Sequence, residues 1–156
     1  MKETKSHKKT TGLTLTIAMT AALAINFGAR AAEIKAPLYQ RLGGMPAIRA
    51  VADDLLNRIA EDARINAWFA WAANPERAAA YKTNLADFIC QATGGPCQYQ
   101  GKGIPATHRG MGITKTEFDS MVEDVAATLD KLQVPETEKN ELLGMLAPLK
   151  PMIVER

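Results

Sequence analysis

The stretch Gly-Gly-Pro-Cys-Gln-Tyr-Gln-Gly-Lys-Gly-Ile-Pro-Ala-Thr-His-Arg-Gly-Met-Gly-Ile, residues 94–113, interrupts an otherwise helical sequence and decides the fold. Eight of its twenty residues are glycine or proline, and both residue types oppose a long helix. A loop of this length inside a compact domain is uncommon and usually functional. The stretch also contains His108, the one histidine after residue 32. We therefore expect the functional residues to gather around it.

Helical periodicity flanks this stretch on both sides. Apolar residues recur at intervals of three and four in four segments, as they do on the buried face of a helix. The four stripes are Ile48, Val51, Leu55, Leu56 and Ile59; Leu85, Phe88 and Ile89; Phe118, Met121, Val122, Val125, Leu129 and Leu132; and Leu142, Leu143, Leu146, Leu149 and Ile153. No comparable alternation of period two is present. The sequence therefore predicts an all-α domain.

Start and stop signals delimit these helices. Pro46 suits the first turn of the first helix, and Pro135 opens the last one. Thr114 followed by Glu117 is a candidate capping box for the helix that begins there. The segment 76–92 is predicted to be a helix that ends at the Gly-Gly-Pro sequence.

The first 32 residues are typical of a secretory signal peptide. Four lysines lie among the first nine residues, an uncharged stretch covers 12–27, and Ala-Arg-Ala-Ala follows at 29–32. The apolar segment is shorter than the roughly 20 residues that span a bilayer. An uncleaved membrane anchor is the alternative, and it is the one case in which we expect contact with a membrane. We expect a periplasmic or secreted protein whose mature domain covers residues 33–156.

The charge balance changes when this segment is set aside. Residues 33–156 carry 14 lysine and arginine residues against 16 aspartate and glutamate residues, a net charge of −2. The net charge of +2 for the whole chain therefore comes from the targeting segment. Without a basic surface, nucleic-acid binding has no electrostatic basis. The remaining length suits one domain with one hydrophobic core.

Both cysteines, Cys90 and Cys97, lie in the mature part. In an oxidising compartment this spacing suits a disulfide across a turn. Two buried free thiols are the alternative. The spacing does not match Cys-x-x-Cys-His, so covalent haem attachment of the c type is not indicated, and it matches no familiar zinc pattern.

His108 is the candidate ligand for a cofactor. A neutral imidazole can hold haem iron from one side and leave the other side open. A lone histidine in a glycine-rich loop can equally be a surface or structural residue. A zinc site would need three or four ligands, and no second histidine is present in the mature part.

Several motifs in order resemble group I truncated haemoglobins. Leu-Tyr-Gln-Arg-Leu-Gly-Gly at residues 38–44 resembles the segment that opens these proteins, and residues 62–69 resemble their Asp-x-x-Ile/Leu-x-x-Phe-Phe stretch. The most specific match is Gly-Gly-Pro and Tyr-x-Gly within 94–101, followed at 104–114 by the histidine, glycine and Gly-Ile-Thr of the family. The resemblance covers roughly residues 37–154 and places the family's proximal ligand on His108 without a gap.

The resemblance implies a truncated globin, in which two helix pairs cross over haem b as a two-over-two sandwich. His108 would be the axial ligand of a five-coordinate iron. Tyr99 and Lys102 are placed where they could reach a propionate. The other candidate haem-pocket residues, each of which could instead be ordinary core, are Phe69, Phe88, Ile89, Ile104 and Val122.

The distal side departs from the better-known family pattern. Many members carry a tyrosine in the second helix that donates a hydrogen bond to dioxygen, and that position here is Leu56. A glutamine or other polar residue often helps from the next helix, and that position here is Leu85. Tyr81 lies one turn earlier and can donate, whereas Lys82 is expected to face solvent. The segment 70–80 is longer than in typical members. Without a donor, dioxygen should dissociate more readily, and the haem iron should autoxidise more readily. The binding of carbon monoxide and nitric oxide should be less affected.

The implied function is reversible binding of dioxygen, or of carbon monoxide or nitric oxide, as in oxygen transport. A haem enzyme, either a nitric-oxide dioxygenase or a peroxidase-like protein, is the alternative at the same site, and we expect the non-enzymatic role. No flavin or nicotinamide fingerprint is present, so any electron donor would be an external reductase. A haem-free helical interaction domain stapled by Cys90 and Cys97 is the third interpretation.

Overall fold

The computed structural model describes residues 35–156, and the predicted signal peptide lies outside these residues. All regular secondary structure in the described part is helical, which confirms the predicted all-α class. None of the helices within residues 35–156 is long and apolar enough to cross a membrane. In chain order the elements are α1 (Leu38–Arg41), α2 (Gly44–Glu61), η1 (Asn66–Ala73), α3 (Pro75–Ala92), α4 (Ile104–His108), α5 (Lys115–Lys131), α6 (Glu136–Gly144), η2 (Ala147–Leu149) and α7 (Lys150–Ile153).

The helix starts follow the local sequence. The Thr114 hydroxyl accepts a hydrogen bond from the Glu117 amide at 3.2 Å, and the Glu117 carboxylate accepts one from the Thr114 amide at 2.8 Å. This reciprocal pair confirms the predicted capping box at the start of α5. Helix α3 begins at Pro75, and the Asn74 side chain accepts a hydrogen bond from the Arg77 amide at 3.0 Å.

The last apolar stripe is less regular than its periodicity predicts. A single helix opened by Pro135 was expected, but the structure divides the segment into α6, the 3-10 turn η2 and α7. Pro148 lies in η2 and Pro151 lies in the first turn of α7. Each proline lacks the amide hydrogen that a continuous helix needs, so the helix breaks before it.

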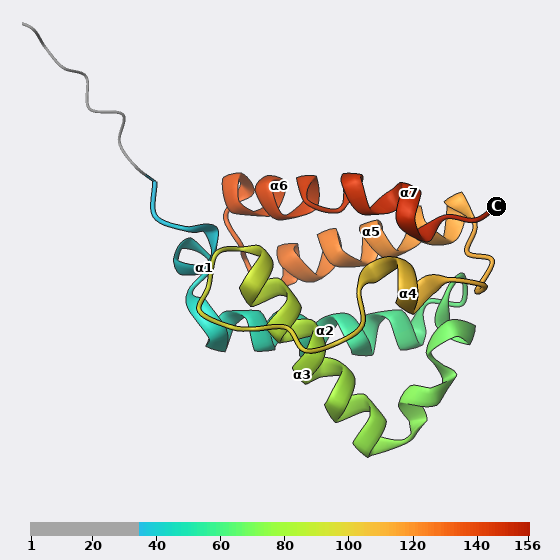
Figure 1. Ribbon diagram of the computed structural model, residues 1–156. Helices are drawn as coiled ribbons and strands as arrows, with labels where there is room; N and C mark the ends of the chain where they lie inside the picture. The colour runs from blue at the N-terminus through green and yellow to red at the C-terminus, as the bar shows by residue number, and fades with distance from the viewer. Residues whose placement is uncertain (1–34) are drawn as a thin grey trace, which may run out of the picture. The chain divides into compact units, whose positions relative to one another are not determined.

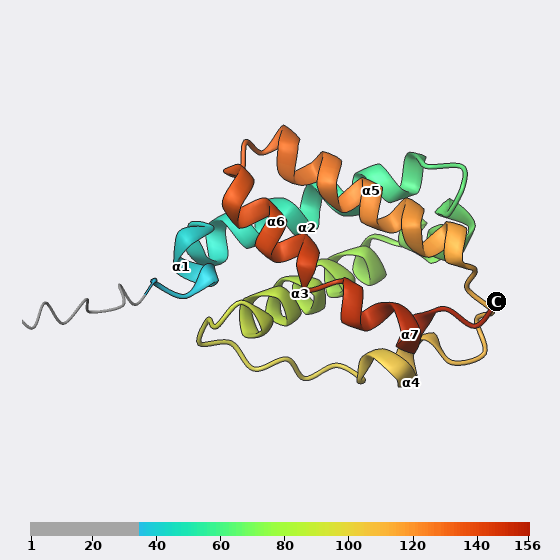
Figure 2. The ribbon, with the colours of Figure 1, turned by 90° about the horizontal axis from the view of Figure 1, so that it is seen from above.

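Two helix pairs build the core. Helix α2 packs against α3, α5 and η1 (Figure 1), and α5 packs in turn against α6. Seen from above, α5 crosses α2 at an angle (Figure 2). Ile59 of α2 and Leu129 of α5 belong to one core cluster, and neither has exposed surface. The short helix α4 packs against α7.

An extended segment joins α3 to α4 and runs along the edge of the domain (Figure 2). Cys90, fully buried near the end of α3, forms a disulfide with Cys97 in this segment, with a Cα–Cα distance of 5.8 Å. The Tyr99 amide also donates to the Gln91 side chain at 2.8 Å. The Gly95 amide donates to the Cys90 carbonyl at 2.8 Å as well. The segment that leads to His108 is therefore attached to α3 by a disulfide and by several hydrogen bonds.

Candidate functional site

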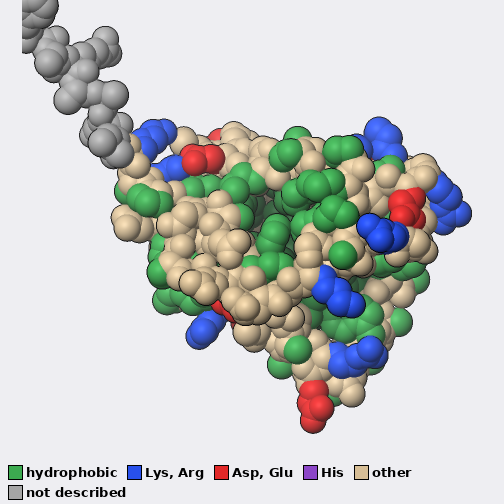
Figure 3. Space-filling view, in the orientation of Figure 1, with side chains coloured by type: hydrophobic (Ala, Val, Ile, Leu, Met, Phe, Trp, Pro, Cys, Tyr) green, Lys and Arg blue, Asp and Glu red, His purple; other side chains and the backbone are tan. Residues whose placement is uncertain are grey.

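A cavity of about 580 Å³ lies within the domain. Residues of α2, η1, α3, α4 and α5 and the C-terminal residues 146–153 form its walls. On the face drawn in Figure 3, hydrophobic side chains gather around a hollow, with lysine and arginine side chains to the right of it. A mostly apolar cavity of this size is typical of a site for a small molecule or cofactor.

The structure brings most of the predicted site residues together. Nine of the predicted residues line this cavity: Phe69, Tyr81, Leu85, Phe88, Tyr99, Lys102, Ile104, His108 and Val122. They come from five different elements or loops, so the fold and not the sequence spacing assembles them. The predicted disulfide pair, Cys90 and Cys97, lies outside the cavity wall.

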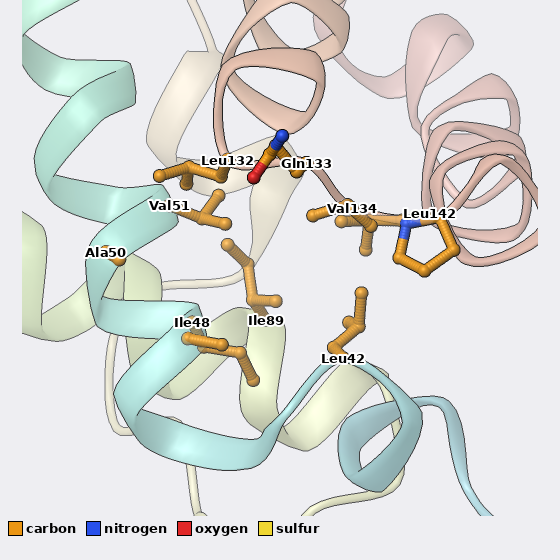
Figure 4. A pocket seen from close by; sticks show the side chains of 11 residues that line it. Leu42, Ile48, Ala50, Val51, Ile89, Leu132, Gln133, Val134 and Leu142 are labelled. Atoms are coloured by element: carbon orange, nitrogen blue, oxygen red, sulfur yellow. The ribbon is translucent and has the colours of Figure 1, made fainter.

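Two predicted pocket residues lie elsewhere. Leu56 is buried in the core, and its neighbour Leu55 lines the cavity in its place. Ile89 lines a second, smaller hollow of about 210 Å³, where it faces Val51 and Val134 (Figure 4). Successive helix residues are separated by about 100°, so a count that is one residue off selects a side chain on a different face.

Several cavity residues were not predicted. Leu146, Leu149 and Ile153 were recognised only as members of an apolar stripe, and that pattern does not separate a cavity wall from a core. Trp68 and Trp71 also line the cavity. Trp71 lies in the longer segment 70–80, where the family pattern offers no secure register.

His108 is held in one ring orientation. Its Nδ1 atom lies 2.7 Å from the carbonyl oxygen of Ile104, one turn earlier in α4. A carbonyl can only accept, so Nδ1 carries the proton of the neutral ring. The lone pair is therefore on Nε2, the nitrogen that is free to bind a metal. His108 is half-buried and lines the cavity.

An aromatic group covers another part of the cavity wall. The ring centroid of Tyr81 lies 5.9 Å from that of Phe69 and 5.1 Å from that of Trp71. No residue between 35 and 156 hydrogen-bonds the Tyr81 hydroxyl. Burial raises the pKa of Tyr81 to about 12. The hydroxyl is protonated at neutral pH, as any tyrosine is at its ordinary pKa, and can donate a hydrogen bond.

A carboxylate joins the 3-10 segment η1 to α5. The Trp68 indole N–H donates to the Glu117 carboxylate at 2.8 Å, and Glu117 is also part of the capping box. Hydrogen bonds from the Thr114 amide and hydroxyl, and then from Trp68, lower the pKa of Glu117. One ionised side chain thus fixes the start of α5 and the tryptophan next to Phe69.

The polar residues at the cavity differ in what they can still bind. The Tyr99 hydroxyl donates to the Lys102 carbonyl at 3.1 Å, so its proton is already used. The Lys102 ammonium forms no ion pair within residues 35–156 and lines the cavity. Of the two residues that were expected to reach a propionate, Lys102 is the one with free donors.

Comparison with known proteins identifies the family. Residues 37–155 match the bacterial-like globin family. The chain is 32% identical to a group 1 truncated hemoglobin of Mycolicibacterium paratuberculosis over 118 residues, which cover 76% of this chain and 84% of that protein. The chain belongs to the truncated haemoglobins. A group 1 truncated hemoglobin of Tetrahymena pyriformis is also 32% identical, over 67% of this chain and 83% of the relative.

Solved structures of truncated haemoglobins share the fold. The Fe(III) form of the Tetrahymena pyriformis truncated hemoglobin matches 78% of this chain and 100% of that chain, with 26% identity and a TM-score of 0.69. The 2/2 hemoglobin of a Synechococcus species in the cyanomet state, with covalently attached heme, gives the same coverage, 25% identity and a TM-score of 0.69. These matches confirm the predicted two-over-two globin fold.

The residues of this truncated haemoglobin fit the cofactor of its family. Haem is the cofactor of globins, and it needs a largely apolar slot together with one ligand nitrogen. The cavity supplies the apolar walls, and His108 supplies an imidazole whose Nδ1 is already bonded and whose Nε2 is free. The chain is thus a haem globin that binds diatomic ligands.

Proposed function

We propose that His108 binds the haem iron through Nε2 and that the chain reversibly binds dioxygen on the other face of the haem. One observation carries this proposal: a half-buried histidine lines the cavity, with its Nδ1 atom already bonded to the Ile104 carbonyl. That bond sets the tautomer and makes the ring a better ligand. Haem held by one histidine supplies an iron with an open position for a diatomic ligand.

The apolar walls keep water away from the ligand side of the haem. Leu55, Leu85 and Val125 line the cavity and offer no hydrogen bonds. Low water content favours retention of a neutral ligand and of the cofactor itself. Tyr81 is the hydroxyl donor that we assign to the ligand side, because it lines the cavity and its hydroxyl has no hydrogen-bond partner among residues 35–156.

The experiment that tests the axial ligand is absorption spectroscopy of the haem-loaded protein beside a His108→Ala variant. We expect a histidine-ligated ferrous spectrum that shifts on addition of carbon monoxide, and we expect the variant to lose or grossly alter it. A protein that binds no stoichiometric haem, or a spectrum that does not depend on His108, would contradict the proposal.

We also propose that residues 1–32 direct export and are cleaved. The basic start, the uncharged segment 12–27 and the small residues at 29–32 support it. The disulfide between Cys90 and Cys97 is consistent with an oxidising compartment. Mass spectrometry of the protein recovered from cells that express the full-length chain tests this proposal, since retention of the full mass would argue for an uncleaved anchor.

A further inference from the structure

The turn that follows His108 has a special backbone. Gly110 and Gly112 have φ angles of +79° and +65°, in the left-handed region where a side chain is strained. A Cβ atom on Gly112 would also lie 2.8 Å from the Arg156 guanidinium. Two left-handed glycines separated by one residue turn the chain sharply, directly after the histidine.

The carboxylate of Glu155 binds both glycine amides. Its Oε1 atom accepts from Gly110 N–H at 2.7 Å, and its Oε2 atom accepts from Gly112 N–H at 2.6 Å. The Met111 amide between them donates to the His108 carbonyl at 3.1 Å. Clustered backbone amides of this kind form a concavity that binds anions. Here the anion is a side chain of the same protein, and the two hydrogen bonds lower the pKa of Glu155.

Other bonds hold the C-terminal residues against the same turn. The Ile113 carbonyl accepts from the Glu155 amide at 2.9 Å, and the Arg156 Nε donates to the Gly112 carbonyl at 2.9 Å. Helix α7 also packs against α4, which carries His108. Loss of the Glu155 carboxylate should therefore free two amides without releasing the C-terminal segment.

We propose that Glu155 is a positioning residue for His108. The Ile104 carbonyl fixes the imidazole ring from the preceding turn, and Glu155 fixes the backbone immediately after the histidine. The ring is thereby fixed by its own hydrogen bond, and the backbone that carries it is fixed by the turn that Glu155 stabilises. This inference rests on the proposed ligation of haem iron by His108.

The test is Glu155→Gln in the haem-loaded protein. Glutamine keeps the shape and one oxygen, but its amide nitrogen cannot accept the second N–H. Glu61→Gln is the matched control, because Glu61 is exposed and makes no hydrogen bond or ion pair within residues 35–156. We expect the iron–histidine stretching band in the resonance Raman spectrum of the ferrous protein to shift or broaden in Glu155→Gln alone. We expect haem loss to become about fivefold faster, the effect of losing roughly one net hydrogen bond.

A second readout does not need haem. In the haem-free protein, hydrogen exchange of the Gly110 and Gly112 amides should become about tenfold faster in Glu155→Gln and stay unchanged in Glu61→Gln. Glu155→Asp keeps both carboxylate oxygens and should restore the Raman band at least in part. If Glu155→Gln does not fold, as judged by circular dichroism, the same band measured in Glu155→Asp and Glu155→Ala decides the question, and an identical band in the two contradicts the proposal.

The outcomes separate this inference from the proposed function. An unchanged Raman band in Glu155→Gln, with the band abolished in His108→Ala, would overturn the role of Glu155 and leave the axial ligand standing. A wild-type band in His108→Ala would instead overturn the proposed ligation itself. Faster amide exchange with an unchanged Raman band would show that the carboxylate stabilises the turn only, which also contradicts a positioning role.

Discussion

Tyr81 is the residue on which we expect ligand discrimination to depend. Its ring packs against both Phe69 and Trp71, which also contact each other, and its hydroxyl is protonated at neutral pH. Dioxygen gains more from a hydrogen-bond donor than carbon monoxide does, because more negative charge develops on it. Tyr81→Phe should therefore raise the dioxygen dissociation rate about tenfold, the effect of roughly one charge-assisted hydrogen bond, and change carbon monoxide dissociation much less.

Stopped-flow displacement of dioxygen by carbon monoxide measures this effect. Tyr99→Phe is the matched control, since it removes a cavity hydroxyl that is already bonded to the Lys102 carbonyl. If Tyr81→Phe and the wild-type protein release dioxygen at the same rate, Tyr81 does not donate a hydrogen bond to bound dioxygen.

Most of the individual cavity residues could be predicted from the sequence, but not all of them. His108, Tyr81 and Leu85 were located from motifs and register, and all three line the cavity. Leu56 was selected by the same count, yet Leu55 is the residue on the wall. Both leucines are buried and both belong to the same stripe. The sequence pattern specifies that a helix face is apolar, but the small rotation that turns one leucine toward the cavity comes from tertiary packing.

At the scale of elements, the start of α5 is held by its capping box. Thr114→Ala removes the hydroxyl that accepts from the Glu117 amide, and it should lower the free energy of unfolding by about 1 kcal/mol. Thr116→Ala is the matched control, because Thr116 is an exposed residue in the first turn of the same helix. Urea denaturation of both variants measures the difference. Equal losses in the two would mean that the cap contributes nothing beyond helix propensity.

The same cap predicts a pH dependence. The folded state lowers the pKa of Glu117, so its stabilising contribution is fully present above the ordinary glutamate value and is lost as the pH falls through the lower, folded value. The stability difference between the wild-type protein and Glu117→Gln should be greatest near neutral pH and shrink as the pH falls below about 4. A difference that grows in acid would have the wrong sign for this account.

The disulfide joins α3 to the segment that leads to His108. Closing so short a loop should contribute about 2 kcal/mol to the free energy of unfolding. We expect a reductant to accelerate haem loss, because the segment between α3 and α4 is then no longer covalently attached to α3. Transfer of haem to an excess of an acceptor globin measures the rate. A variant with both Cys90→Ala and Cys97→Ala should lose haem quickly whether or not reductant is present. If the oxidised and reduced wild-type proteins lose haem at equal rates, the disulfide does not contribute to haem retention.

Elements were predicted well where periodicity was long and uninterrupted. Helices α2, α3 and α5 form where their apolar periodicity predicts them. The segment 135–153 instead divides near its prolines, which the apolar spacing alone does not take into account. The disulfide was one of two alternatives from the cysteine spacing, and the fold places the two residues 5.8 Å apart at Cα. The Glu155 contacts could not be predicted, because no local pattern links residue 155 to a turn more than forty residues earlier.

At the scale of the whole molecule, one cavity draws its walls from most of the domain. Segments from α2 to the C-terminal residues contribute, although they are up to about a hundred positions apart in the sequence. The glycine-rich stretch allows α4 to be short and to lie against α7, so that His108 lines the cavity. Globin helices thus provide the walls, and the interruption between them carries His108, the proposed ligand of the haem iron.

The most direct test of the account is chemical replacement of the His108 side chain. In His108→Gly loaded with haem, the ferrous spectrum should lose its histidine-ligated form, and free imidazole should restore both that form and its carbon monoxide complex. Wild-type protein with the same imidazole concentration is the control for binding on the opposite side. A His108→Gly variant that keeps the wild-type ferrous spectrum without imidazole would contradict the central claim, because another group would then hold the iron.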